Sequence, residues 1–186
     1  MRVIAGQFRS RRLSSLPGLD IRPTLDRLRE TLFNVLSSGS PDALSGTVWV
    51  DLYAGTGAVG IEAISRGASM VYFVESTARA ADLIGRNLRS LKIENGYQLL
   101  RQDVVTAIHT INLAVDYVFL DPPYRRESEY QRCLSALAQS TLLKPETIVI
   151  AEHPKTYDPG DAFSDLLRYR RLLQGDAGLS FYRKTS

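Results

Sequence analysis

One segment constrains the fold of this chain more than any other: a short apolar strand that runs directly into a glycine-rich loop. Residues 48–52, with the sequence VWVDL, have the apolar and β-branched character of a buried strand. Three glycines follow at the spacing G-x-G-x-x-G, as Gly55, Gly57 and Gly60. Such glycines let the backbone turn sharply and approach a ligand closely, while the following helix presents its N-terminus to anionic groups. Because the same spacing also serves tight packing between a strand and a helix, the glycines alone leave both interpretations open.

From Thr47 onward, short apolar runs alternate with segments whose apolar residues recur at helical spacing. This alternation predicts a parallel sheet covered by helices on both faces. Further along, the sequence QGDAG separates two strand-like runs and predicts an antiparallel hairpin at one sheet edge. Strands are expected at residues 48–52, 70–74, 97–100, 117–120, 147–151, 167–173 and 179–182, with helices at 59–66, 78–91 and 130–138. We therefore expect an α/β fold with a mostly parallel, seven-stranded sheet and a C-terminal antiparallel hairpin.

A basic extension precedes this domain. Residues 1–34 carry seven arginines, no lysine and a net charge of +4, whereas the remainder of the chain is close to neutral. Arginine binds phosphate through a planar fork, so a basic arm on a neutral body indicates contact with nucleic acid, although a solvated face remains the alternative. We expect a small hairpin and a helix in residues 1–36, and a separate domain over residues 46–186. The candidate RNA-binding side chains are Arg9, Arg11, Arg12 and Arg22.

Composition excludes several other classes of protein. Hydrophobic residues make up 44% of the chain, which is typical of a globular protein and not of a disordered one. The single cysteine, Cys133, excludes a disulfide framework and a cysteine-rich zinc site, and two histidines leave little for a metal cluster. The apolar runs are too short to cross a membrane, and the N-terminus has no signal-like apolar region. We expect a cytoplasmic monomer without a metal.

Three acidic residues follow the first three predicted strands of the domain. Asp51, Glu75 and Asp103 should line up along the carboxyl edge of the sheet, where open α/β folds bind ligands. Glu75 can accept both hydroxyls of a ribose. Asp51 would repel a pyrophosphate but suits the cationic amino acid end of S-adenosylmethionine. Asp103 could accept from an adenine amino group, or it could simply cap a helix.

The fourth predicted strand ends in the sequence Asp121-Pro122-Pro123-Tyr124. The prolines stiffen the loop and remove two N–H donors, which leaves the Asp121 carboxylate and the Pro122 carbonyl as a rigid pair of acceptors. Such a pair matches the two N–H groups of an exocyclic amino group on a base. Holding both hydrogens would draw the nitrogen lone pair out of conjugation and aim it at a methyl donor. Tyr124 can stack on the plane of the base.

This combination of motifs resembles the class I, Rossmann-like S-adenosylmethionine-dependent methyltransferases that modify amino groups of bases. More narrowly, it is similar to the bacterial 16S rRNA guanine-N2 methyltransferases of the RsmD type. The segments that carry the resemblance are RVIAG at residues 2–6, RRL at 11–13, RPT at 22–24, RE at 29–30, LFN at 32–34, DLYAGTG at 51–57, GIEA at 60–63, SRGA at 65–68, FVE at 73–75 and DPPY at 121–124. Ser10 departs from the pattern, because the family usually has glycine there.

The resemblance implies a Rossmann-like methyltransferase fold and methyl transfer to the N2 atom of guanine 966 of 16S rRNA, in naked rRNA or a pre-assembled 30S subunit. The expected cofactor is S-adenosylmethionine, with S-adenosylhomocysteine as its product. The catalytic candidates are Asp121, Pro122 and Tyr124, and the cofactor-binding candidates are Asp51, Tyr53, Gly55, Gly57, Glu75 and Asp103.

Three other functions are compatible with parts of the sequence. A DNA adenine-N6 methyltransferase could use the same acceptor loop, and a non-catalytic rRNA-binding assembly factor could keep the same fold. A nicotinamide-dependent oxidoreductase would share the glycine loop, but Asp51 and the lack of a substrate domain disfavour it.

Overall fold

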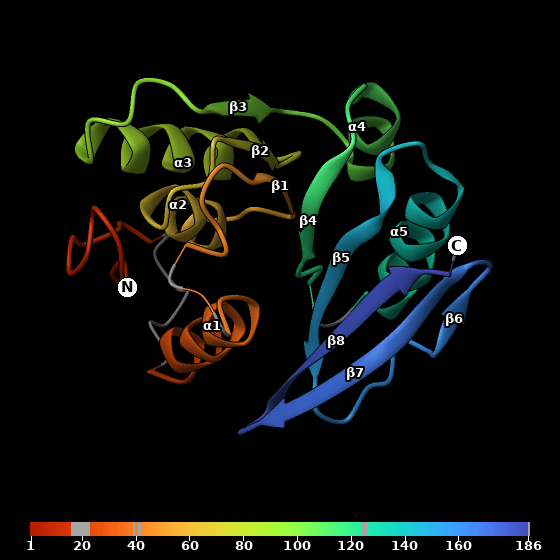
Figure 1. Cartoon of the computed structure of the whole chain (residues 1–186). Helices are drawn as coiled ribbons and strands as arrows, with labels where there is room; N and C mark the ends of the chain where they lie inside the picture. Colours follow the sequence, from red (N-terminus) through yellow and green to blue (C-terminus); the bar gives the residue numbers. More distant parts are fainter. Residues whose placement is uncertain (16–22, 39, 41, 124–125, 186) are drawn as a thin grey trace.

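The structure, a computed structural model, describes residues 1–15, 23–38, 40, 42–123 and 126–185 of the 186-residue chain. Its elements alternate between strands and helices from residue 48 to residue 154 and end in antiparallel strands (Figure 1). The helices are α1 (Pro23–Leu36), α2 (Ala58–Ser65), α3 (Ala78–Ser90), α4 (Val104–Thr110) and α5 (Glu127–Gln139). The strands are β1 (Val48–Leu52), β2 (Met70–Val74), β3 (Tyr97–Leu100), β4 (Val115–Leu120), β5 (Leu143–Pro154), β6 (Ala162–Phe163), β7 (Leu166–Gln174) and β8 (Ala177–Lys184).

The strands form one sheet in the order β3-β2-β1-β4-β5-β8-β7-β6. The first five are parallel, and β8, β7 and β6 follow as antiparallel neighbours. The mostly parallel sheet with a C-terminal antiparallel hairpin is therefore confirmed. The expected count of seven strands is wrong, because the two-residue strand β6 pairs with β7 and is too short to leave a pattern in the sequence.

Each face of the sheet has its own hydrophobic core, because neighbouring strand residues point to opposite sides. Trp49 packs on one face with the apolar residues of α1, α2 and α3, and Val50 packs on the other with those of α4 and α5. Both residues are fully buried. Within the part of the chain that the structure describes, no helix is long and apolar enough to span a membrane.

The N-terminal arm, residues 1–15, lies against α2 and α3 (Figure 1). Its two ends pair as a short hairpin: Arg2 and Arg12 form an antiparallel bridge, the Val3 N–H donates to the Arg11 carbonyl at 3.0 Å, and the Leu13 N–H donates to the Met1 carbonyl at 3.1 Å. Beyond this pairing, the N–H groups of Ile4 and Ala5 donate to the buried Glu62 carboxylate at 2.7 and 3.0 Å. Ser10, the departure from the family pattern, takes the left-handed conformation with φ of 67°.

Two further contacts fix the arm. The Phe8 N–H donates to the Ser65 hydroxyl at 2.9 Å, and the side-chain amide of buried Asn87 exchanges hydrogen bonds with the backbone of Ser14. Gly6 makes the closest approach, since an added Cβ would lie 1.8 Å from the Ser65 carbonyl oxygen. The arm therefore depends on a glycine at that position.

We expect Gly6→Ala to reduce the free energy of unfolding far more than Gly46→Ala. The two glycines have similar φ values, +79° and +74°, so both variants incur the left-handed strain of roughly 1–2 kcal/mol. Only Gly6 adds a clash, because no described atom lies within 4 Å of a Cβ at Gly46. Urea denaturation should show an excess loss of at least about 2 kcal/mol for Gly6→Ala. Equal losses of stability in the two variants would mean that the arm does not pack closely against Ser65.

Candidate active site

The three glycines of the loop serve different physical purposes. Gly55 and Gly57 have φ values of +55° and +76°, which other residues rarely adopt. A Cβ at Gly55 would touch only the Tyr53 carbonyl oxygen, at 3.8 Å, so the loop is open on that side. At Gly60 a Cβ would lie 2.3 Å from the Phe73 ring, so this glycine lets α2 pack closely on the sheet. The same loop therefore leaves open space beside Gly55 and allows close packing at Gly60.

Asp51 lies at the end of β1 and is only 2% exposed. Its Oδ2 atom accepts the Gly60 N–H at 2.9 Å, which ties the strand to the first turn of α2. Burial, with a contribution from the charge of Glu75, raises the pKa of Asp51 to about 7, against the lowering effect of the Gly60 hydrogen bond. The carboxyl group is therefore poised between its neutral and charged forms near neutral pH.

Glu75, just after β2, lies beside the glycine loop although 20 positions separate it from Gly55. Its Oε2 atom accepts the Gly55 N–H at 3.1 Å. Its Oε1 atom accepts both the N–H and the hydroxyl of Thr77, each at 2.9 Å. These contacts fix the carboxylate at the carboxyl edge of the sheet, where its role with a cofactor stays a proposal.

Tyr53 and Asp103 both form hydrogen bonds with residues of α5. The Tyr53 hydroxyl donates to Glu129 at 2.7 Å and lies 3.0 Å from the Cys133 sulfur. Asp103 caps α4 by accepting from the Val105 N–H at 3.0 Å, and it pairs with Arg132 at 2.6 Å.

Arg132 also pairs with Glu129 at 3.1 Å, so one polar chain joins Tyr53 to Asp103. The hydrogen bond from Arg132 is the main reason that the pKa of Asp103 is lowered. The helix-capping interpretation of Asp103 is confirmed, and its contact with adenine stays a proposal. Cys133 is buried on α5.

The acceptor loop follows β4, which lies next to β1 in the sheet. Asp121 therefore comes out beside the end of β1, and within the described residues no donor is bonded to its carboxylate or to the Pro122 carbonyl. Burial raises the pKa of Asp121 well above its ordinary value, and the charges of Glu152 and Asp51 add to this. Tyr124 lies outside the described residues.

Sequence reasoning missed Glu152, which contributes to this electrostatic environment. It lies on β5, one position beyond the Leu120–Ala151 pair, and is 8% exposed. The signal that could have found it is a single glutamate within the apolar strand sequence IVIAEH. A buried acid in such a run indicates a specific environment, because carboxylates are almost never fully buried without one.

The arginines of the arm are on its surface. Arg9, Arg11 and Arg12 are exposed, and the Arg11 guanidinium donates to the Ser90 carbonyl at 3.2 Å. Arg22 lies outside the described residues. The structure thus presents three of the four candidate RNA-binding side chains to solvent.

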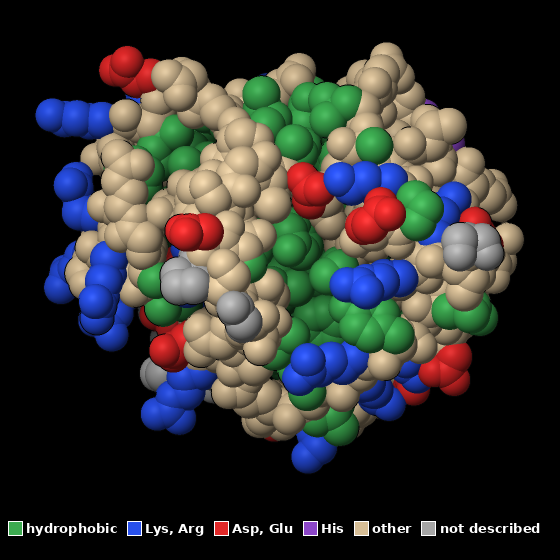
Figure 2. All heavy atoms as spheres, in the orientation of Figure 1, with side chains coloured by type: hydrophobic (Ala, Val, Ile, Leu, Met, Phe, Trp, Pro, Cys, Tyr) green, Lys and Arg blue, Asp and Glu red, His purple; other side chains and the backbone are tan. Residues whose placement is uncertain are grey.

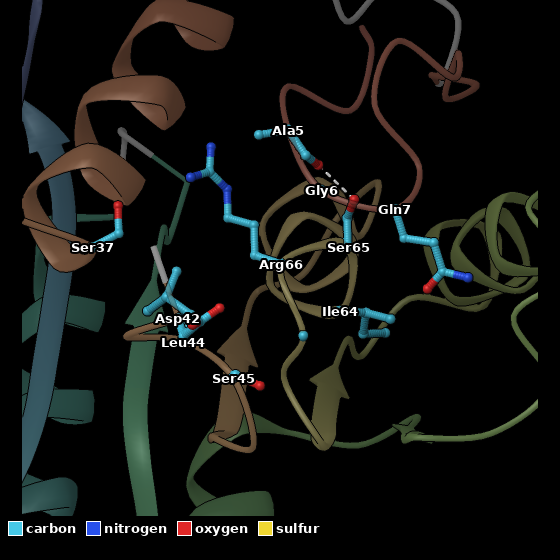
Figure 3. A pocket seen from close by; sticks show the side chains of 11 residues that line it. Ala5, Gly6, Gln7, Ser37, Asp42, Leu44, Ser45, Ile64, Ser65 and Arg66 are labelled. Carbon is cyan, nitrogen blue, oxygen red and sulfur yellow. Dashed lines mark hydrogen bonds between the residues drawn. The ribbon is translucent and has the colours of Figure 1, made fainter. Parts of the chain in front are cut away.

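A cavity of about 480 Å³ lies at the opposite end of α2 from the glycine loop. Figure 3 shows its lining, where the Ser65 hydroxyl of α2 donates to the Ala5 carbonyl of the arm and Arg66 extends toward α1, which ends just before Ser37. The glycine loop enters α2 at Gly57, at the N-terminal end of the helix. This cavity is therefore separate from the carboxyl-edge site.

Comparison with known proteins assigns the family. A family model described as "Conserved hypothetical protein 95" matches residues 1–183. The chain belongs to this family, that of the RsmD-type rRNA methyltransferases.

Members of the family resemble this chain over most of their length. The YlbH protein of Bacillus subtilis is 31% identical over 187 residues, which is 99% of each chain. Ribosomal RNA small subunit methyltransferase D of Escherichia coli is 32% identical over 152 residues, covering 82% of this chain and 74% of that one. The solved structure of the Escherichia coli protein yhhF has a TM-score of 0.83 and 26% identity, covering 99% of this chain and 97% of that one. The Rossmann-like methyltransferase fold is thus confirmed.

The raised pKa of Asp51 predicts a pH-dependent stability. The folded protein holds this proton more tightly than the unfolded chain does, so the free energy of unfolding should fall as the pH rises from about 4 to about 7. Asp51→Asn keeps an oxygen for the Gly60 N–H but has no proton to lose. At pH 8, thermal denaturation should find the variant more stable than the wild type, by at most about 4 kcal/mol.

Two comparisons make this test specific. At pH 4.5 the advantage of Asp51→Asn should shrink, because the wild-type carboxyl is then neutral. Asp51→Ala also has no proton to lose but leaves the Gly60 N–H without its acceptor, so it should be less stable than Asp51→Asn by about 1–3 kcal/mol at either pH. An Asn variant that is less stable than the wild type at pH 8 would contradict the raised pKa.

Proposed function

We propose that this protein transfers a methyl group from S-adenosylmethionine to the exocyclic N2 of a guanine in small-subunit rRNA. The observation that carries the proposal is the juxtaposition of two motifs at adjacent strand ends: the glycine loop after β1 and the acceptor pair of Asp121 and Pro122 after β4. The name of the Escherichia coli relative, a small-subunit rRNA methyltransferase, supports the substrate class.

The residues at the carboxyl edge fit the proposed cofactor. The open side of Gly55 gives room for close backbone approach, and Glu75 supplies a fixed carboxylate of the kind that accepts ribose hydroxyls. Asp51 adds a carboxyl group next to the loop that would interact, directly or through water, with a cationic amino acid group. When bound, S-adenosylmethionine supplies an electrophilic methyl group on a positively charged sulfur.

The protein's own task is to bind the amino group of the base and orient it. The Asp121 carboxylate and the Pro122 carbonyl accept its two N–H hydrogens, and no described donor competes for either acceptor. Pro122 is buried, its ring locks φ, and the following Pro123 restricts its ψ to extended values, so the direction of the Pro122 carbonyl is constrained. Tyr124 is proposed to stack on the base, and Arg9, Arg11, Arg12 and Arg22 to contact phosphates of the surrounding RNA.

The raised pKa of Asp121 has a consequence for the reaction. The ionised carboxylate is the stronger hydrogen-bond acceptor, and burial with neighbouring negative charge favours the neutral form. Methyl transfer should therefore increase with pH as Asp121 loses its proton. A positively charged ligand at this edge would favour the ionised form of both Asp121 and Asp51.

We expect Asp121→Asn to lower the rate of methyl transfer by about 100-fold or more, because a fixed partner of the reacting group is lost. Calorimetry should find the affinity for S-adenosylmethionine nearly unchanged. Asp116→Asn is the matched control: Asp116 lies at the other end of β4, where it bonds the Val48 N–H and Lys144.

The assay is tritium-methyl transfer to naked 16S rRNA, assembled 30S subunits and DNA. The proposal is supported if the wild type and Asp116→Asn methylate rRNA or subunits and Asp121→Asn does not. Transfer to DNA alone would replace it with the DNA methyltransferase alternative.

Glu75→Ala should weaken the binding of S-adenosylmethionine by about 1.5–3 kcal/mol, because a charged acceptor of hydrogen bonds is removed. Glu75→Gln keeps an oxygen for the Gly55 N–H and should lose less. Glu94→Ala removes an exposed glutamate from the loop between α3 and β3 and serves as the control. Calorimetry measures all three, and unchanged affinity in Glu75→Ala would remove this residue from the site.

A further inference from the structure

The β7–β8 hairpin presents two different faces to its surroundings. Residues directly opposite each other in an antiparallel pair lie on the same face of a sheet. Leu167 pairs with Arg183, Arg170 with Phe181 and Leu172 with Leu179, and these three pairs share the face that carries α1. The register shift between Arg168 and Arg170 also brings Tyr169 to this face, where its ring lies 6.3 Å from that of Phe181.

This face combines exposed apolar and aromatic groups with arginine. Tyr169 is 49% exposed and Leu167 is 38% exposed. The Arg183 guanidinium lies over the Tyr169 ring, 5.0 Å from its centroid, and Arg170 lies 5.9 Å from the centroid of Phe181. We call Leu167, Tyr169, Arg170, Leu172 and Arg183 the hairpin face. Figure 2 shows hydrophobic side chains gathered in a hollow on this side of the molecule, with Lys and Arg at its edge over β7 and β8.

The arginines on the two faces of the hairpin differ in their ion pairs. On the opposite face, Arg168 pairs with Asp158 and Asp161, and Arg171 pairs with Asp158. On the hairpin face, neither Arg170 nor Arg183 has an ion-pair partner among the residues that the structure describes. Two uncompensated guanidinium groups beside an exposed ring favour an anionic partner with flat groups that stack.

The hairpin face also leads toward the proposed catalytic loop. Leu172 and Leu179 pair across the hairpin, and Leu179 pairs with Glu152 of β5. Glu152 lies close enough to Asp121 to raise its pKa. Tyr169 lies at the level between Phe181 and Tyr182, two to three residues along the strand from Leu179, or roughly 8 Å, and β5 lies two strands from β7, or roughly 10 Å across the sheet. The resulting separation of roughly 13 Å is a span that about two nucleotides of an extended strand could bridge.

We propose that the hairpin face binds single-stranded rRNA next to the target nucleotide, with Tyr169 and Arg183 as a stacking pair for an unpaired base and Arg170 as a phosphate contact. Bases stack on aromatic rings and on guanidinium planes alike, and phosphate matches the free charge of this face. This proposal rests on the proposed function, because it takes rRNA as the substrate. It adds a second RNA-binding surface to the arm, on a different part of the chain.

The test measures the affinity of a 16S rRNA fragment across a salt series, separately from methyl transfer. Tyr169→Ala should weaken binding by roughly 5- to 100-fold without changing the salt slope, and Tyr169→Phe should bind almost normally. Arg170→Gln removes the proposed phosphate contact and should lower the salt slope by about 0.7. Arg183→Lys keeps the positive charge but loses the planar guanidinium group. We therefore expect an unchanged salt slope and a lower affinity for the RNA fragment.

Two matched controls lie on the opposite face of the same strand. Leu173 is 50% exposed and pairs with Gly178, so Leu173→Ala removes an equally exposed apolar side chain. Arg171→Gln removes a charge that Asp158 already neutralises. Both variants should bind RNA like the wild type, and thermal denaturation of every variant separates loss of folding from loss of binding.

The outcomes separate this proposal from the proposed function. If the wild type methylates rRNA and the hairpin-face variants bind rRNA normally, the proposed role of the hairpin face is wrong and the proposed function stands. A wild type that neither binds nor methylates rRNA overturns both. If sedimentation shows self-association that Tyr169→Ala abolishes while RNA binding is unchanged, the face is an interface between copies of the chain and the proposal is wrong.

Discussion

A single buried hydrogen bond, from the Gly60 N–H to the Asp51 carboxyl group, fixes how the chain leaves its first strand. It joins the end of β1 to the first turn of α2, and Gly60 lets that turn lie directly on the Phe73 ring. With both ends of the intervening loop held, Gly55 and Gly57 adopt their left-handed conformations at the open edge beside Glu75. The opposite end of the same helix carries Ser65, which seats the arm. One short helix thus links the proposed cofactor loop to the N-terminal arm.

The carboxyl edge concentrates negative charge at a considerable electrostatic cost. Asp51 is buried, Asp121 is half-buried, and both have raised pKa values, to which the charges of Glu75 and Glu152 respectively contribute. A protein of this size retains only a small net stability, so buried acids persist where a ligand or a reaction needs them. A cationic cofactor and an amino group with two donors would each relieve part of this cost. The same edge is therefore unfavourable when empty and well suited to both proposed ligands.

The sequence predicted the parts of the fold that depend on periodicity. The strands at residues 70–74 and 97–100 have their predicted bounds, because apolar runs between turn residues report burial directly. The strand β6 was missed because two residues carry no period, and nothing in the sequence indicates that N–H groups of the arm donate to Glu62, 57 or 58 positions away in the chain. Long-range side-chain partners of this kind leave no local pattern.

In the candidate site, too, the sequence predicted the positions set by strand ends but not the contacts set by long-range packing. Glu75 and Gly55 were expected at one sheet edge, and they lie within hydrogen-bonding distance. The chain of contacts from Tyr53 through Glu129 and Arg132 to Asp103 depends on how α5 packs, and Glu152 depends on the register of β5. Strand-end position predicts which residues gather at an edge. It does not predict which way each side chain turns once helices cover the sheet.

The most direct measurement is the identity of the methylated nucleoside. Small-subunit rRNA that has reacted with the protein and S-adenosylmethionine is digested to nucleosides, which mass spectrometry then separates and identifies. The acceptor pair of Asp121 and Pro122 predicts methylation of an exocyclic amino group of a base, and the resemblance to the family narrows the proposed product to guanosine with one methyl group on N2, with no product from the Asp121→Asn variant. A methyl group on a ring nitrogen, on carbon or on a ribose hydroxyl would contradict the account, because none of these atoms carries the two hydrogens that the acceptor pair is built to hold.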